Sequence, residues 1–321
     1  VEPDGTVAAV EGQDTEFRVL DDGTVLRNGT PAGNIELAPG ADPAESLLAI
    51  PTSYLQIAYS DDDGLTWSRP RDLNPELKQQ WMRFLGTCPG NGIALRNGPH
   101  AGRLIVPLYF NNDQNWLAMC ATVAYSDDHG ETWQLGHGPN EGRQIPQGEL
   151  DPQTFVDETW SLHEAAVVER QDGVLVLFMR NQHPRGRVAV SESHDAGQTW
   201  GPIRFDEALP EIWCQPNAIS LPSPEGEDRI VFANASLMLP FRGCGVIRLS
   251  LDGGRSWKHS RTFNPGHYVY QCMCVLPDGR IGILWENECQ GLYFSRLPLS
   301  WFSDGLETVD PRQAESQDSQ S

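Results

Sequence analysis

The pattern Ser-x-Asp-x-Gly-x-Thr/Ser-Trp occurs four times in this chain of 321 residues, as SDDDGLTW (60–67), SDDHGETW (126–133), SHDAGQTW (193–200) and SLDGGRSW (250–257). The four boxes recur every 57 to 67 residues, and each follows a short apolar strand. A spacing of this size fits one four-stranded sheet with its loops, and repetition of such sheets around an axis makes a β-propeller. The repeat therefore predicts an all-β propeller.

Each box has the residues of a turn. Its Asp can accept hydrogen bonds from nearby backbone N–H groups, and its Gly can adopt a positive φ. Its Trp is expected to bury the ring between neighbouring sheets. Chemistry rarely needs four equivalent copies of a residue, whereas a repeated fold does. The boxes are therefore predicted to be the frame, and the alternative is that their aspartates are catalytic or bind metal.

Composition narrows the class of protein. The formal net charge of −21 argues against a nucleic-acid partner, and no apolar run is long enough for a membrane span. The tightest pair among seven cysteines, Cys272 and Cys274, alternates along a strand, so both thiols should lie on one face. No His or Cys partners stand at zinc-ligand spacing. We expect buried thiols, no metal and no cofactor.

Two hairpins between the boxes carry polar residues at matching positions. In HEAAVVERQDGVLVLFMRN, Glu164 and Arg180 lie eight residues before and after the Asp of an Asp-Gly turn. In YQCMCVLPDGRIGILWEN, Tyr270 and Glu286 lie at the same two offsets. Positions equidistant from a hairpin turn stand side by side. The sequence thus predicts that Glu164 pairs with Arg180, and Tyr270 with Glu286.

A third strand, GRLIVPLYFN, places Tyr109 at the position equivalent to Arg180 and Glu286 when the strands are aligned on their glycines. In a propeller, the innermost strands line a central channel and their ends converge on one face. Polar residues at one repeated position should therefore gather in one pocket. The alternative is that they form a plain surface ion pair and half-buried aromatic contacts.

These motifs resemble the bacterial exo-α-sialidases (neuraminidases), which are six-bladed propellers with repeated Asp boxes. The resemblance runs from about Phe17 to Phe302 and is strongest in WMRFLGTCPGNGIALRNGPHAGRLIVPLY, YSDDHGETW, LFMRN and GRIGILWEN. It implies an enzyme that releases terminal sialic acid from glycans and glycoproteins, with a secreted or cell-surface location.

The resemblance also implies roles for individual residues. Tyr270 matches the family's nucleophile and Glu164 its paired base, while Arg180 and Arg242 match two of three arginines that bind the sialic acid carboxylate. The remaining matches are a carboxylate that orients an arginine and two pocket residues: Glu286, Tyr109 and Gln215.

The chemistry fits those roles. Sialic acid carries a carboxylate on its anomeric carbon, so a carboxylate nucleophile would meet like charge, whereas a neutral Tyr would not. The ordinary pKa of Tyr is near 10, so Tyr270 needs a base. Tyr-nucleophile sialidases are a known exception to the two-carboxylate rule for glycosidases. The implied reaction is retaining hydrolysis; transfer to another acceptor and a non-catalytic glycan-binding propeller are the alternatives.

One part of the family pattern is absent. The family begins its propeller with an Arg-Ile-Pro segment that carries the first arginine, followed by an Asp that acts as general acid. This chain has EFRVLDDG at 16–23, in which Arg18 with Asp21 or Asp22 are the alternative candidates. We expect instead that 1–46 is a β-rich insertion, that 47–304 form the blades, and that 305–321 are a disordered tail. The first blade, with the arginine and the acid, is then expected upstream of Val1.

Overall fold

The protein is an all-β molecule in the computed structural model, which describes residues 6–8, 14–20, 24–34, 53–112, 114–221, 223, 226–238, 240–287 and 290–303. The described part contains only three short helical turns: α1 (Asn74–Leu77), a 3₁₀ turn η2 (Glu158–Trp160) and α2 (Ser300–Ser303). None of the helices in that part is long and apolar enough to cross a membrane. The expected tail, 305–321, and the expected boundary at residue 46 lie outside the described residues.

Antiparallel sheets make up the fold, and most of them follow the order of the chain. The first sheet contains β1 (Thr6–Ala8), β2 (Asp14–Val19), β3 (Thr24–Arg27) and β4 (Thr30–Asn34). A two-stranded pair, β5 (Gln56–Ile57) and β6 (Arg71–Asp72), follows it and flanks the first Asp box.

The next three sheets are larger. One contains β7 (Phe84–Thr87), β8 (Ile93–Ala94), β9 (Leu104–Asn111), β10 (Met119–Ser126) and β11 (Gln134–Leu135). A small pair, β12 (Gln144–Ile145) and β13 (Gly148–Glu149), separates it from β14 (Leu162–Glu169), β15 (Leu175–Asn181), β16 (Arg187–Ser193) and β17 (Arg204–Pro210). The third contains β18 (Asn217–Leu221), β19 (Arg229–Met238), β20 (Arg242–Ser250) and β21 (His259–His267).

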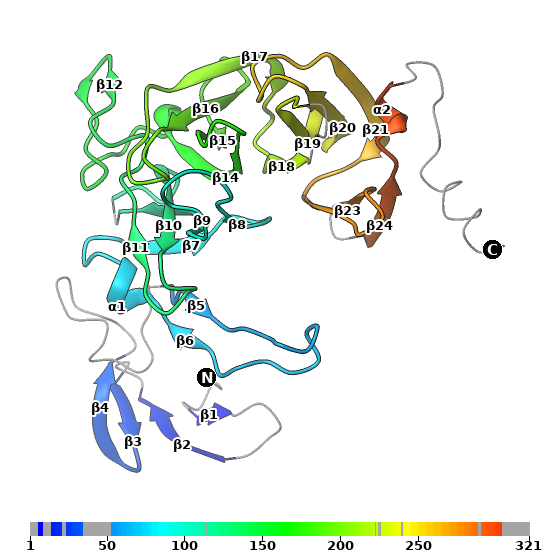
Figure 1. The fold of residues 1–321 in the computed structure, drawn as a ribbon. Helices are drawn as coiled ribbons and strands as arrows, with labels where there is room; N and C mark the ends of the chain where they lie inside the picture. The colour runs from blue at the N-terminus through cyan, green and yellow to red at the C-terminus, as the bar shows by residue number, and fades with distance from the viewer. Residues whose placement is uncertain are drawn as a thin grey trace.

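The last sheet has three strands: β22 (Gln271–Val275), β23 (Ile281–Glu286) and β24 (Leu292–Leu297). Figure 1 shows the sheets following one another along an arc, as blades of a propeller do. The first strands of successive sheets, β14, β18 and β22, pack against one another on its inner side. Apolar side chains such as Leu177, Phe232 and Ile283 are fully buried between the sheets.

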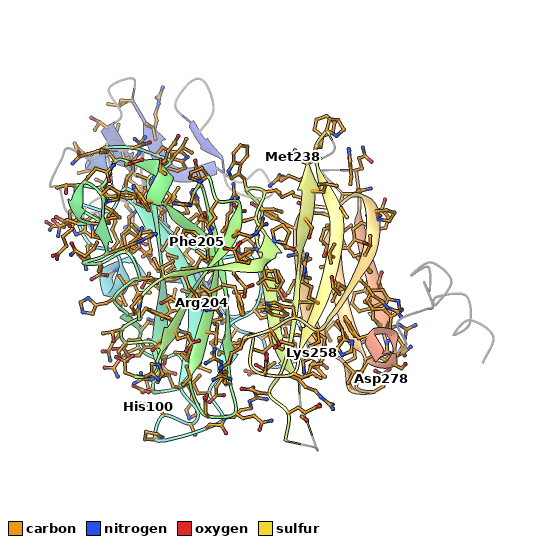
Figure 2. The ribbon with its side chains drawn as sticks, turned by 90° about the horizontal axis from the view of Figure 1, so that it is seen from above. His100, Arg204, Phe205, Met238, Lys258 and Asp278 are labelled. Carbon is orange, nitrogen blue, oxygen red and sulfur yellow. The ribbon has the colours of Figure 1, made fainter. Side chains whose placement is uncertain are left out.

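The two ends of the strands differ in what they present. In Figure 2, Asp278, in the β22–β23 turn, lies toward one edge of the sheets, and Met238, at the end of β19, lies at the opposite edge. Arg242, the first residue of β20, pairs with Met238 across the β19–β20 hairpin. The open ends of the hairpins and Arg242 thus share the edge that is opposite the Asp-Gly turn of β22–β23.

All four Asp boxes form the same turn. In the second box, Asp128 accepts the Thr132 amide at 2.9 Å and the Thr132 hydroxyl at 2.6 Å, and Ser126 Oγ accepts the Gly130 amide at 2.8 Å. The residue before the box Gly also has a positive φ in every copy. Aspartates that are committed to their own turns are structural, as the frame prediction required. The turn residues are Asp62, Asp128, Asp195 and Asp252.

The prediction that each box Trp is buried is wrong for one copy. Trp133 is only 6% exposed, and Trp200 and Trp257 are half-buried, but Trp67 is 65% exposed. The described residues provide no sheet that packs over Trp67, although its indole still donates to Gly64 O at 3.1 Å. The local turn therefore forms without the inter-sheet contact.

The prediction of buried thiols is also wrong for the Cys272–Cys274 pair. Both residues lie on one face of β22 as expected, but Cys272 is half-buried and Cys274 is exposed. The reason is that Met273 takes the core-facing position between them. Among the described residues, no three His, Cys, Asp or Glu side chains are grouped closely enough to hold a metal ion.

The frame can be tested at the second box. Trp133→Ala should lower the free energy of unfolding by about 3–5 kcal/mol, because it deletes a large ring from the core between sheets. Trp67→Ala is the matched control and should cost about 1 kcal/mol or less, since its ring is mostly in water. Urea unfolding measures both. Equal losses in the two variants would contradict the assignment.

Candidate active site

Three predicted residues meet in one hydrogen-bonded cluster. The hydroxyl of Tyr270 donates to Glu164 Oε1 at 2.6 Å, and Arg180 Nη1 donates to Glu164 Oε2 at 2.6 Å. Arg180 Nη1 also lies 3.1 Å from the Tyr270 hydroxyl. Glu164 is nearly buried, whereas Arg180 keeps 21% of its side chain exposed. The cluster therefore joins a phenol, a nearly buried carboxylate and a partly exposed guanidinium.

The hairpin register explains how residues far apart in the chain meet. In the β14–β15 hairpin, Ala165 pairs with Met179, the register that puts Glu164 beside Arg180, and a bulge follows towards Leu162. In the β22–β23 hairpin, Gln271 pairs with Trp285, and the Glu286 amide donates to Tyr270 O at 3.0 Å. Both pairings predicted from the Asp-Gly turns are confirmed.

Electrostatics keep the phenol protonated and the guanidinium charged. Burial raises the pKa of Tyr270 above its ordinary value, and the negative charge of Glu164 raises it further. Burial alone would lower the pKa of Arg180, but the Glu164 carboxylate outweighs that effect and raises it. Tyr270 at rest is therefore a neutral phenol that shares its proton with a carboxylate, and a fixed positive charge stands beside both.

Arg242 and Tyr109 extend the cluster. The guanidinium of Arg242 lies over the Tyr270 ring, 5.5 Å from its centroid, and Arg242 Nη1 donates to Trp213 O at 3.4 Å. Burial raises the pKa of Tyr109 to about 12, and the charge of Glu164 acts in the same direction. Two arginines from separate sheets therefore flank Tyr270, and the charge of Glu164 also acts on a second phenol.

The other two predicted residues have different surroundings. Glu286 is half-buried and is held beside Tyr270 by the backbone pairing of their strands. Gln215 is fully buried, and its side chain donates to Pro89 O and accepts the Gln271 amide at 3.4 Å. The structure thus places Gln215 as a buried link between the segment that follows β7 and the start of β22, and not among the exposed groups of the cluster.

Glu211 is a charged residue near the cluster that sequence reasoning missed. It follows the last residue of β17 and is 7% exposed, and its Oε1 accepts the Cys214 amide at 3.0 Å. Burial raises its pKa to about 7, although the charge of Arg180 opposes the rise. No motif or hairpin offset in the sequence marks this position, so only the tertiary fold reveals it.

Glu211 predicts a pH-dependent stability. The pKa of Glu211 is ordinarily 4.5 and about 7 in the folded protein. Its contribution to the free energy of unfolding is therefore full below about pH 4.5 and is lost as the pH rises through about 7. The loss from this group should be about 3 kcal/mol. Glu211→Gln should remove the contribution of this group, so the urea midpoint should fall less between about pH 5 and about pH 8 in the variant than in the unaltered protein. If the variant lost as much stability between the two pH values as the unaltered protein, Glu211 would not be the group responsible.

Arg18, the alternative site residue that the structure describes, is not part of the cluster. Arg18 is exposed on β2, where its Cα pairs with Thr6 and Leu26. Figure 1 shows the β1–β4 sheet at one end of the arc and the β22–β24 sheet towards the other. Asp21 and Asp22 lie outside the described residues.

Comparison with known proteins identifies the family of this chain. Residues 45–283 match the family described as the BNR repeat-like domain. The chain is 34% identical over 272 residues to a sialidase of Micromonospora viridifaciens, a match that covers 82% of this chain and 37% of the relative.

Solved structures that are similar to this chain include a sialidase and a trans-sialidase. The Hadza microbial sialidase Hz136 aligns with a TM-score of 0.62 at 27% identity over 85% of this chain and 49% of its own. The intramolecular trans-sialidase of Ruminococcus gnavus, solved with oseltamivir carboxylate, aligns with a TM-score of 0.64 at 26% identity over 94% of this chain and 66% of its own.

The chain spans less than half the length of the Micromonospora relative. The family match alone covers more than half of the chain. The chain belongs to the BNR repeat-like domain family, and its relatives there are sialidases, as the sequence resemblance predicted.

Proposed function

We propose that this chain carries the nucleophile, its base and two carboxylate-binding arginines of a retaining exo-α-sialidase. The observation that carries the proposal is the 2.6 Å hydrogen bond from the Tyr270 hydroxyl to Glu164, with Arg180 in contact with both. A glycan-binding protein has no need for a tyrosine paired with a buried base. The proposed substrate is a sialylated glycan or glycoprotein, and the proposed location is secreted or at the cell surface.

The reaction has two steps. In the first, the Tyr270 oxygen attacks the anomeric carbon, its proton passes to Glu164, and the bond to the leaving oxygen breaks as a general acid gives that oxygen a proton. In the second, water attacks the same carbon and gives one proton to the conjugate base of that acid, the bond to Tyr270 breaks, and Glu164 returns its proton to the phenolate. Two inversions at one carbon retain its configuration.

Arginines suit the substrate because a guanidinium binds two carboxylate oxygens and stays charged. Arg180 and Arg242 approach Tyr270 from two different sheets, so both can reach a carboxylate attached to the carbon under attack. The protein carries a formal net charge of −21, and a local cationic pair also offsets the repulsion of an anionic sugar.

We further propose that a first blade, upstream of these residues, completes a six-bladed ring and supplies the third arginine and the general acid. Two groups of exposed apolar side chains support this. Trp67 and Leu65 are exposed between β5 and β6, and Leu284, Leu292 and Phe294 are exposed on the β22–β24 sheet. Large exposed apolar patches mark surfaces that another element covers.

Transfer in place of hydrolysis is the second candidate, because the Ruminococcus gnavus neighbour is an intramolecular trans-sialidase. In that case a hydroxyl of the bound sugar itself, and not water, would attack the anomeric carbon. The product would be lighter than free sialic acid by one water molecule.

A fluorogenic aryl sialoside tests the proposal. We expect saturable release of the aryl group and no release from the corresponding β-galactoside, which lacks the carboxylate that Arg180 and Arg242 would bind. Mass spectrometry of the sugar product then separates hydrolysis from intramolecular transfer. Binding of the sialoside without any release of the aryl group, in a protein that also carries the first blade, would favour the glycan-binding alternative.

A further inference from the structure

A cavity lies on the other side of the β7–β11 sheet from the Tyr270 cluster. It has a volume of about 260 Å³ and is bounded by residues next to α1, by β9, by the end of β11 and by the loop 151–153. Tyr109 and Phe110 are successive residues of β9, so their side chains point to opposite faces. Tyr109 packs towards the core beside β14, whereas Phe110 packs in the core that lines this cavity.

Trp81 gives the cavity a fixed aromatic surface. Its indole N–H donates to Gln79 Oε1 at 2.7 Å, and its ring meets Phe110 edge to face, 5.6 Å between centroids at an interplanar angle of 74°. Phe110 is itself 2% exposed, so it forms a rigid backing. A ring held at its polar end and backed by a second ring offers a stable apolar face to a ligand.

Side chains that can accept or donate hydrogen bonds surround the aromatic face of Trp81. Glu141 and Asp151 contribute carboxylates, and Gln79 and Gln153 contribute amides. Asp151 is itself held in place, because its Oδ1 accepts a hydrogen bond from the backbone N–H of Gln153 at 3.0 Å. An aromatic face bordered by carboxylates and amides is complementary to a sugar ring, which has an apolar C–H face and a rim of hydroxyls.

Charge narrows the ligand further. Among the described residues that line the cavity there is no Lys or Arg, and two carboxylates are present, so an anionic sugar would be repelled. A cation is disfavoured as well, because both oxygens of Glu141 are already engaged. One contacts His137 Nδ1 at 2.5 Å, and the other accepts the Gly138 amide at 2.8 Å. The remaining class is a neutral ligand rich in hydroxyls.

We propose that this cavity binds a neutral hexopyranose, stacked on Trp81 and hydrogen-bonded by Asp151 and Gln153. Its volume is slightly below the range that holds drug-sized ligands, which is the scale of one sugar ring. Neutral sugars remain on a glycan once its terminal acid has been removed. The site would therefore hold a glycan by a part that the Tyr270 cluster does not recognise.

The test uses lactose as the probe on the full chain with Tyr270→Phe, so that turnover plays no part. Titration calorimetry should give one site with an affinity in the millimolar range, as expected for a ligand of this size. Saturating free sialic acid should leave lactose binding unchanged. This result does not depend on sialidase activity, so its failure and the failure of the proposed function are distinguishable.

Variants identify the site. Trp81→Ala should abolish lactose binding, and Asp151→Ala should weaken it about tenfold by removing one acceptor. Because Trp81 also packs against the core, Asp151→Ala, at an exposed position, separates loss of binding from loss of folding. Trp116→Ala is the matched control, since Trp116 is 53% exposed but does not line the cavity.

Three results would overturn the proposal. One is the absence of lactose binding up to its solubility limit. Another is binding that sialic acid displaces or that Asp151→Ala leaves unchanged, which would place lactose elsewhere. The third is saturable binding of tetramethylammonium in place of lactose, which would make the cavity a cation site.

Discussion

Tyr270→Phe is expected to lower kcat by roughly four to six powers of ten, the range seen when a member of a nucleophilic catalytic set is removed. The substitution deletes only the hydroxyl that donates to Glu164, and the ring that packs under Arg242 remains. The circular dichroism spectrum and the urea midpoint should therefore stay the same. Turnover of an aryl sialoside measures the effect.

Tyr109→Phe is the matched control for that loss. Tyr109 belongs to the same cluster, and its pKa responds to the same carboxylate, but it lies on a different sheet from Tyr270. As a binding residue it should raise KM and change kcat by no more than about tenfold. Near-normal kcat for Tyr270→Phe, or equal losses in both variants, would contradict the nucleophile assignment.

The second large expected effect is on the rate of cleavage, and it depends on the general acid. If it lies on a first blade outside these 321 residues, the isolated chain should cleave a natural sialoside about 10²–10⁴ times more slowly than a protein that includes that blade. An aryl leaving group departs without a proton, so an aryl sialoside should suffer much less. The ratio of the two rates, measured with and without the blade, isolates protonation from binding.

Adding the first blade should also change the oligomeric state of the protein. The exposed Trp67 and the exposed apolar face of the β22–β24 sheet should make the isolated chain self-associate, and the added blade should make it monodisperse in size-exclusion chromatography. A monodisperse isolated chain with full activity on a natural sialoside would contradict the proposal and would require another acid.

The sequence predicts the central part of the site because the hairpin turns fix the register. Asp-Gly turns set which residues stand opposite each other, so counting outwards from Asp172 and Asp278 is enough to pair Glu164 with Arg180 and Tyr270 with Glu286. The Asp boxes are equally local, because every hydrogen bond within them spans four residues or fewer.

Contacts between sheets are not predictable in this way. Trp67 has the same motif as Trp133, yet its exposure depends on what the neighbouring sheet supplies. Gln215 matches the family pattern for a pocket residue, but its buried side chain bonds to Pro89 O, after β7, and to the backbone amide of Gln271, in β22. Glu211 has no sequence signature at all, and only the folded core gives it a raised pKa. Each of these outcomes depends on distant segments and not on local spacing.

Trapping the covalent intermediate tests the central claim most directly. A sialyl fluoride with a second fluorine beside the anomeric carbon should form the glycosyl-enzyme and slow its breakdown, because the added fluorine destabilises the oxocarbenium-like transition state. Peptide mass mapping should then find one sialyl adduct, on the peptide that contains Tyr270, and none in Tyr270→Phe. An adduct on Glu164, or turnover of the reagent by the enzyme with no adduct on Tyr270, would contradict the account.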